Sequence, residues 1–361
     1  MPVPLVDVRA QYERLIPQLL ARFEEVLESG TLILGPNVKA FEQEAAAYLG
    51  VPQTVGVANG TDALVLVLEA LEIGAGDEVV CPSFTFYATA EAIIRTGATP
   101  VFADIDPVTL NVDPEDVAAK VTERTLALMP VHLFGRPAEL EPLVDLGIPI
   151  IEDAAQAFGA PGVATTGVAS TFSFFPTKNL FGLGDGGLVA ATDEELADRV
   201  RLLRFHGSRD KKTFTHVGTN SRLDELQAAA LRLFLGELDG WTRARREAAA
   251  RYAELGLGEF CDLPEDEPGH VYHMYVVRTP ERPRLAEALS AAGIGNASYY
   301  VTPTHLQPAL KFLGVAEGSL PETERASREN LALPMWAGIP AEVQERVVSV
   351  VREASSVRAA S

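Results

Sequence analysis

The sequence predicts an α/β protein built on a mostly parallel, helix-covered sheet. From Thr54 to Ala191, short apolar segments alternate with helix-like segments, and this alternation is typical of βαβ units. After about Gly256 it gives way to separate strands and helices with Pro- and Gly-rich stretches between them. A chain of 361 residues is long enough to divide in two. We therefore expect a large domain over residues 1–240 and a smaller C-terminal α+β domain over residues 241–361.

The expected elements follow from apolar periodicity and from cap residues. Helices are expected at Gln11–Ser29, Pro36–Leu49, from Thr61, near Thr85–Arg95, Ala138–Leu146, Asp193–His206, Ser221–Leu238 and Trp241–Leu255. Strands are expected at Thr54–Ala58, Glu78–Cys81, Thr99–Ala103, Leu126–Val131, Ile148–Glu152, Thr171–Phe175, Leu188–Ala191, Val271–Val277 and Ala297–Tyr300. The tail Ala354–Ser361 is expected to fray.

Composition excludes several classes of protein. The net charge of −20 argues against binding nucleic acid or an anionic membrane through bulk electrostatics. Cys81 and Cys261 are too few for a disulfide framework, which fits a reducing cytoplasm. The six histidines show no metal-ligand spacing, so no metal is expected. Met1–Gln11 lacks the pattern of a signal peptide, and no apolar run approaches the length of a membrane span.

Lys178 is the candidate catalytic residue of the chain. Only six lysines are present, and Lys178 alone directly follows an aromatic, strand-like segment, Thr171–Phe175. Pro176 cannot continue a central strand, so the chain turns and presents the lysine just past the strand end. An amine in a partly dry pocket has a lowered pKa and forms Schiff bases with carbonyls. The alternative is a surface lysine in a loop.

The stretch Gly182–Gly187 matches G-x-G-x-x-G letter for letter. A dinucleotide site needs those glycines directly after a strand and at the start of a helix. Here a lysine loop precedes them and the strand-like Leu188–Ala191 follows. We reject the dinucleotide interpretation and expect a tight, hairpin-like turn with positive φ.

Two other strand exits carry polar groups. Gly60 and Thr61 follow a strand and open a helix, where free N–H groups and the helix dipole favour an anion; alternatively, Thr61 only caps the helix. Asp153 ends a buried strand, at the edge of the sheet where ligands bind in α/β proteins, and could pair with a cationic ring nitrogen. Gln156 would share its face, whereas the alternative makes Asp153 a helix cap.

Two further segments complete the set. Phe86 follows another strand and could stack on a flat cofactor, although most such rings lie in a core. Ser221 and Asp224 have the spacing of a capping box, and Asn220 directly precedes them. A Schiff-base lysine, an acid for a pyridinium nitrogen, an aromatic ring and a phosphate-binding helix start are together the parts of a pyridoxal 5'-phosphate site.

The whole set of motifs resembles one family. VANGTDAL, PSFTFYATAEAI, VHLFG, IEDAAQAFGA, SFFPTKNL with GDGG, NSRLDELQAAALR and TPTHLQPAL occur in this order. They resemble the DegT/DnrJ/EryC1/StrS family of sugar aminotransferases, over about Leu5 to Leu333. The resemblance implies a pyridoxal phosphate-dependent transferase of fold type I, similar to aspartate aminotransferase, with a mostly parallel seven-stranded sheet. It also implies a homodimer with shared active sites.

The resemblance also assigns roles to residues. It implies that Lys178 carries the cofactor, that Asp153 pairs with its ring nitrogen and that Gln156 contacts its ring hydroxyl. The other implied cofactor contacts are a stacking Phe86, the phosphate ligands Gly60, Thr61 and Ser173, and Asn220 from the partner subunit. His305 and Tyr300 resemble residues on the sugar side.

The implied reaction transfers an amino group from L-glutamate, leaving 2-oxoglutarate, to a keto nucleotide sugar. NSRLDELQAA together with THLQP is most similar to members that act on 3-keto sugars, and C4-specific members are close. A pyridoxal phosphate lyase or desulfurase is an alternative, although a desulfurase needs a mobile cysteine. A non-catalytic, sugar-responsive regulator with the same fold is another. The sequence does not name the sugar or its nucleotide.

Overall fold

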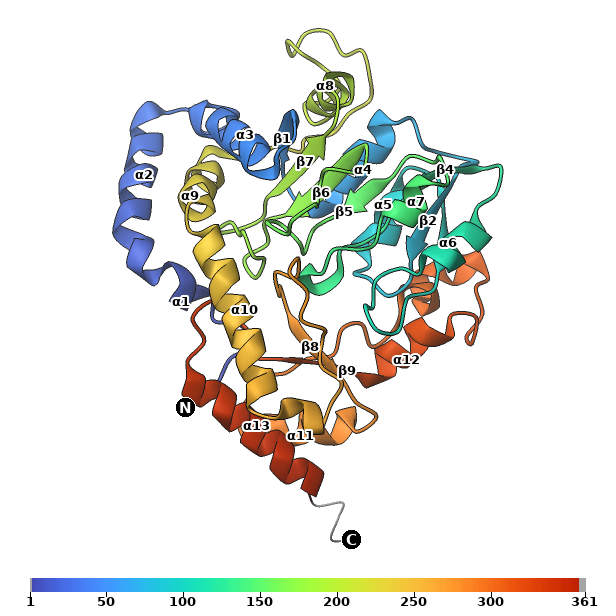
Figure 1. Cartoon of the computed structure of the whole chain (residues 1–361). Helices are drawn as coiled ribbons and strands as arrows, with labels where there is room; N and C mark the ends of the chain where they lie inside the picture. The colour runs from blue at the N-terminus through green and yellow to red at the C-terminus, as the bar shows by residue number, and fades with distance from the viewer. Residues whose placement is uncertain (1, 357–361) are drawn as a thin grey trace.

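Seven strands form the central sheet of the computed structural model, which describes residues 2–356 (Figure 1). Two hydrogen-bonded ladders, β1-β7-β6-β5 and β3-β2-β4, are joined by bridges from Leu128 to Ile150 and from Val131 to Asp153. Only β7 runs antiparallel to its neighbours; the remaining pairs are parallel. The strands are β1 Gln53–Val57, β2 Glu78–Pro82, β3 Thr99–Ala103, β4 Thr125–Leu128, β5 Ile151–Asp153, β6 Ala169–Ser173 and β7 Gly187–Ala191. This architecture confirms the expected fold class.

Helices cover both faces of this sheet, as the apolar strands require. Along β7, Val189 and Ala191 pack in a cluster with α4, α5 and α8, whereas Leu188 and Ala190 pack with α2, α3, α9 and α10. The helices are α1 Val8–Tyr12, α2 Ile16–Ser29, α3 Pro36–Leu49, α4 Gly60–Ala70, α5 Ala88–Arg95, α6 Pro114–Lys120, α7 Glu141–Val144, α8 Glu194–Leu203, α9 Glu225–Leu235 and α10 Leu238–Glu254.

The C-terminal part has a core of its own. Its strands β8 (Tyr275–Arg278) and β9 (Asn330–Leu333) pair antiparallel. They pack with α10, with α11 (Arg282–Ala291) and with α13 (Ala341–Ser356). The third helix of this part, α12 (Pro321–Glu329), is not in that cluster. Val3 belongs to the same cluster, so the N-terminal end of the chain packs against the C-terminal part. The boundary between two domains at residues 240 and 241 stays a prediction. Of the predicted frayed tail, residues 354–356 are helical and the rest lies outside the described residues.

Several expected elements are wrong in detail. Strand β8 begins at Tyr275 rather than at Val271, and helix α7 covers only Glu141–Val144 of the expected Ala138–Leu146. Helix α5 begins at Ala88, three residues after Thr85. Helix α9 begins at Glu225 because the Asp224 carboxylate accepts a hydrogen bond from the Gln227 N–H. Ser221 instead accepts one from the Ala58 N–H, so no capping box forms. Residues 297–300 form no strand, since they contribute only a single bridge, from Ala297 to Ala332.

The glycines after the lysine loop are needed for space rather than for a left-handed backbone. None of those between 182 and 187 has a positive φ, so the expected positive-φ turn is wrong. A Cβ at Gly187 would instead lie 2.4 Å from the Asn59 carbonyl carbon. Gly187 pairs with Val57 and with Ser173. It therefore lets β7 pass directly beneath the start of α4.

We predict that Gly187→Ala destabilises the protein because its methyl group overlaps backbone rather than a movable side chain. Overpacking of this kind costs about 1–3 kcal/mol, which lowers the melting temperature by a few degrees. The matched control is Gly240→Ala in α10, where an added Cβ meets nothing within 4 Å and alanine favours the helix. In thermal unfolding, Gly187→Ala should lower the melting temperature and Gly240→Ala should raise it. Equal melting temperatures would refute the close approach of β7 to the start of α4.

Candidate active site

A cavity of about 450 Å³ lies at the carboxyl ends of β5 and β6 and at the start of α4. This is the edge at which parallel α/β sheets bind ligands. Predicted site residues that line it are Gly60, Thr61, Phe86, Asp153, Gln156, Ser173, Lys178 and Tyr300. Eight residues that are dispersed over the sequence therefore share one cavity.

Lys178 lies in the turn that follows β6, where its N–H donates to the Phe175 carbonyl at 2.9 Å. Burial lowers the pKa of the Lys178 amine to about 8, although the Asp153 carboxylate acts in the opposite direction. An amine with this pKa is partly unprotonated near neutral pH, as a nucleophile toward a carbonyl must be. The alternative of a solvated surface lysine does not fit these surroundings.

Asp153 is the last residue of β5 and is buried. Its carboxylate accepts hydrogen bonds from the Thr89 hydroxyl at 2.8 Å and from the Ala155 N–H at 3.2 Å. Burial raises the pKa of Asp153, while these hydrogen bonds and the Lys178 charge oppose the rise. Turns, not a helix, follow it, so it caps no helix. A cation brought against this carboxylate would stabilise its ionised form.

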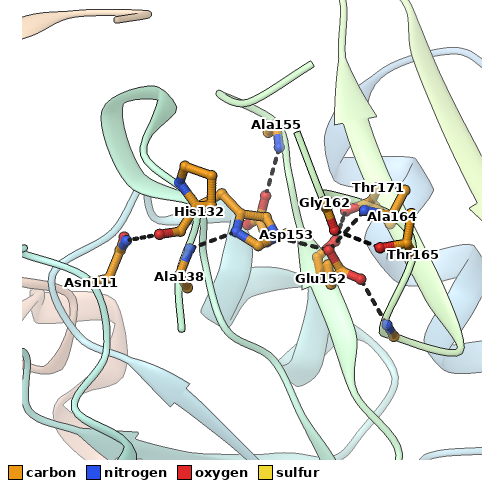
Figure 2. Close-up of polar contacts among 12 residues, drawn as sticks. Asn111, His132, Ala138, Glu152, Asp153, Ala155, Gly162, Ala164, Thr165 and Thr171 are labelled. Carbon is orange, nitrogen blue, oxygen red and sulfur yellow. Dashed lines mark hydrogen bonds and ion pairs between the residues drawn. The ribbon is translucent and has the colours of Figure 1, made fainter. Parts of the chain in front are cut away.

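A second acid, Glu152, secures the same strand from its other side (Figure 2). The His132 ring accepts the Ala138 N–H at Nδ1, so its Nε2–H donates to Glu152, 2.9 Å away. Glu152 also accepts the N–H groups of Ala164 and Gly167. These donors hold the pKa of the buried carboxyl below its usual range. The network fixes β5 directly beside the cavity.

The start of α4 provides an anion cradle. Asn59, not Thr61, caps this helix, because its side chain accepts the Asp62 N–H at 2.8 Å. The capping interpretation of Thr61 is therefore wrong, and its hydroxyl is available to the cavity. A Cβ at Gly60 would lie 2.8 Å from the Ser173 Cβ. Because residue 60 is glycine, the first N–H groups of α4 lie close enough to Ser173 for both to contact the same small anion.

Gln156, Tyr300 and Phe86 form another part of the cavity wall. The Gln156 amide donates to the Tyr300 hydroxyl at 3.0 Å and accepts the Phe134 N–H at 2.7 Å. Both bonds fix the amide's orientation. Phe86 is 59% exposed, and its ring centroid lies 6.3 Å from that of Tyr300. An exposed aromatic ring at a cavity mouth is free to stack on a planar ligand.

Two predicted site residues lie elsewhere in this single chain. His305 is buried between Ser83 and Glu324, at 2.6 Å and 3.4 Å from its ring nitrogens, and does not line the cavity. Asn220 is exposed and pairs with Phe205 at the base of the segment between α8 and α9. That segment projects from the body beside α8 (Figure 1). Their roles toward the sugar and across the dimer stay predictions.

The sequence alone did not single out Thr89, Asp185 or His273, although Thr89 binds Asp153 and the other two line the cavity. The sequence signal for Thr89 was a second hydroxyl four residues after Thr85, near the same strand exit. In the structure the two hydroxyls are 3.0 Å apart. His273 carried no such signal, because the apolar segment around it is typical of an ordinary strand.

Of the two cysteines, Cys81 is buried and burial raises its pKa, which disfavours a desulfurase.

The cavity fits pyridoxal 5'-phosphate. The cradle at Gly60, Thr61 and Ser173 suits a phosphate, and the buried Asp153 suits a cationic ring nitrogen. Lys178 has the pKa that an amine needs to bind an aldehyde. Among residues 2–356, no cluster of side chains is suited to a metal ion, and no helix is long and apolar enough to cross a bilayer. Fold and cavity together define a pyridoxal phosphate-dependent transferase of fold type I.

Comparison with known proteins identifies the family. The model of the DegT/DnrJ/EryC1/StrS aminotransferase family matches residues 14–352, and the chain belongs to this family. A pleiotropic regulatory protein of Geobacillus stearothermophilus is 45% identical, over 98% of each chain. A dTDP-3-amino-3,4,6-trideoxy-alpha-D-glucose transaminase of Streptomyces venezuelae is 43% identical, over 97% of this chain and 96% of its own. The crystal structure of S. venezuelae DesV with a ketimine intermediate superposes with a TM-score of 0.94, at 43% identity over 98% of each chain.

We predict that the Lys178 amine of the cofactor-free protein titrates at a pKa of about 8, well below the value of about 10.4 for an exposed lysine. Competitive acetylation with acetic anhydride across a pH series, read by peptide mass spectrometry, measures this value. A lysine peptide of known pKa serves as the internal standard. Titration of Lys178 together with that standard would place the amine in open solvent.

Proposed function

We propose that this protein transfers the amino group of L-glutamate to the keto group of a nucleotide-linked sugar, at C3. The observation that carries the proposal is the convergence of Lys178, Asp153 and the start of α4 on one cavity. The names of similar proteins support the sugar and the carbon, since the S. venezuelae relative is a transaminase for a 3-amino sugar.

Different residues of the cavity would bind different parts of the cofactor. The phosphate would rest on the first N–H groups of α4, at Gly60 and Thr61, and on the Ser173 hydroxyl. Gln156 would donate toward the ring hydroxyl, and Phe86 would cover the ring. When bound, pyridoxal phosphate supplies an electron sink for the bonds at the donor carbon. Asp153 supports it by keeping a proton on the ring nitrogen.

Lys178 moves the proton. With the cofactor bound, its amine would take a proton from Cα of the donor as a general base and give it up again as a general acid. In the cofactor-free chain the pKa of this amine is about 8, so a fraction of it is unprotonated near neutral pH and can accept a proton. Tyr300, held by Gln156, lines the same cavity, which supports its proposed place on the sugar side.

The active unit of this proposal is a homodimer in which Asn220 acts in the partner's site. Asn220 does not line the cavity of its own chain. The loop His206–Thr219, which directly precedes it, carries three cations, Arg209, Lys211 and Lys212. Phe214 and Val217 of this segment are exposed, Val217 by 97%. A loop whose turn is basic and whose returning arm exposes Phe214 and Val217 suits a neighbour with an acidic substrate. We also propose a cytoplasmic location, which two unpaired, buried cysteines favour.

One alternative is a regulator, favoured by the name of the G. stearothermophilus relative. A regulator has no need of a lysine with a lowered pKa facing a buried acid, and Lys178, Asp153 and Gln156 are all present. The other alternative is amination at C4.

A panel of 3-keto and 4-keto nucleotide sugars with L-glutamate separates these alternatives from the proposed function. We predict 2-oxoglutarate release with 3-keto sugars. Turnover of 4-keto sugars alone would contradict the C3 assignment, and none with any sugar would favour the regulator.

We predict that Asp153→Asn slows amino transfer by roughly 30- to 1000-fold, equivalent to ~2–4 kcal/mol of barrier. The amide lacks the negative charge that keeps the ring nitrogen protonated, whereas its size is unchanged. Steady-state kinetics of the loaded variant measure the effect, and bound cofactor is confirmed by absorbance. Near-normal turnover would leave Asp153 with a purely structural role.

Hybrid dimers test the placement of Asn220. Mixing Lys178→Ala with Asn220→Ala creates dimers in which one site carries both substitutions and the other carries neither. If Asn220 acts across the interface, activity returns upon subunit exchange, to a quarter of wild type at most when half of the dimers are hybrid. Native mass spectrometry verifies the exchange. Exchange without recovered activity would put both residues in the same subunit's site.

A further inference from the structure

Thr89 donates the hydrogen bond that reaches Asp153 from helix α5. Its hydroxyl lies 2.8 Å from Oδ2 of the carboxylate, while the Ala155 N–H reaches Oδ1 at 3.2 Å. Both Thr89 and Asp153 are buried. Among residues 2–356, these are the two hydrogen bonds that the carboxylate accepts. Each oxygen therefore has one donor, and the carboxylate is held from the helix on one side and from the turn after β5 on the other.

The local carbonyls that could compete for the Thr89 hydroxyl have other partners. A threonine hydroxyl often donates to the carbonyl three or four residues earlier in the chain. The Phe86 carbonyl accepts the N–H of Thr89 itself at 3.2 Å. The Thr85 carbonyl accepts the hydroxyl of Thr304, a buried residue of the C-terminal part, at 3.3 Å. Both carbonyls are satisfied without the Thr89 hydroxyl, which serves the acid instead.

A second hydroxyl fixes the direction of this bond. The hydroxyls of Thr85 and Thr89 lie 3.0 Å apart, and a hydroxyl has one proton to donate. Because Thr89 gives its proton to the carboxylate of Asp153, Thr85 is the donor at the contact between the two threonines. Thr85 lines the cavity. The two hydroxyls therefore form a chain that runs from the cavity wall to the acid, in which each bond polarises the next.

The electrostatic surroundings of Asp153 make this hydrogen bond important. Burial raises the pKa of the acid, and the bond from Thr89 is the largest of the contributions that oppose the rise. It does not require any other group to be protonated, whereas the contribution of Lys178 does. The titratable groups that act on Asp153 come from four separate segments: Cys81, His132, Lys178 and Tyr300. Burial raises the pKa of Cys81 and of Tyr300, so neither carries a charge at neutral pH.

We propose that Thr89 is a positioning residue whose hydroxyl, supported by Thr85, holds Asp153 as a carboxylate and orients it toward the cavity. Thr89 does not line the cavity itself, so it acts through the acid. A carboxylate that is stabilised as an anion is a weaker base, and the proton of a ring nitrogen beside it would stay on the ring. This last consequence rests on the proposed function, whereas the hold on Asp153 is a property of the chain alone.

The test uses the cofactor-free, full-length protein, labelled with ¹³C at the side-chain carboxyl carbon of aspartate. The NMR signal of Asp153 is the one that Asp153→Asn lacks, and its shift across a pH series gives the pKa. Thr89→Val keeps the shape of the side chain but removes the donor, so it should raise the pKa of Asp153 by about one to two units. Thr89→Ser retains a hydroxyl and should keep most of the wild-type value. The control is Thr96→Val, which removes a hydroxyl at the end of the same helix that donates to the Ile93 carbonyl, and it should leave this pKa unchanged.

An unchanged or lowered pKa of Asp153 in Thr89→Val would overturn the proposal, as would an equal rise in Thr89→Ser. If Thr89→Val does not fold, Thr89→Ala replaces it with the same expected rise, because its smaller side chain fits the same space. Thr85→Val should raise the pKa by less than Thr89→Val, since the bond from Thr89 to the acid remains; a larger rise would contradict the order of the chain. The measurement involves neither cofactor nor sugar, so failure of the sugar panel and failure of this test are distinguishable.

Discussion

The buried carboxylate of Asp153 is the constraint on which the site depends. Its burial raises its pKa, and a buried charge is stable only when it is paired and hydrogen-bonded. Thr89 and Ala155 supply hydrogen bonds but no charge. Lys178 supplies charge only while it is protonated. In the proposed function a cationic ring nitrogen would complete the set, so the same acid would favour a pyridinium cofactor.

The sheet places every other group relative to that acid. Parallel pairing of β5 with β6 puts Asp153 and the lysine loop at the same edge. The antiparallel strand β7 passes close beneath Asn59, where only Gly187 fits, and so fixes the start of α4 against Ser173. Glu152, one residue before Asp153, anchors β5 through His132. The stability of the core and the geometry of the site therefore rest on the same few strands.

Much of this arrangement could be predicted from the sequence, because it follows from local patterns. Strand exits carry polar residues, and Lys178 is conspicuous in a chain with few lysines. What failed depended on tertiary contacts. Thr61 satisfies the rules of a cap, yet Asn59 takes that place; the glycines of 182–187 suit a turn, yet they make room for neighbouring backbone and side chains. That the buried ring of His273 has no hydrogen-bond partner among residues 2–356 becomes apparent only when the C-terminal segment folds against the lysine loop.

The most direct measurement is the site of covalent attachment. The protein is loaded with pyridoxal 5'-phosphate, reduced with borohydride, digested and mapped by mass spectrometry. The label is expected on Lys178, and Lys178→Ala is expected to take up none. Label on Lys211 or Lys212, with Lys178 unmodified, would contradict it.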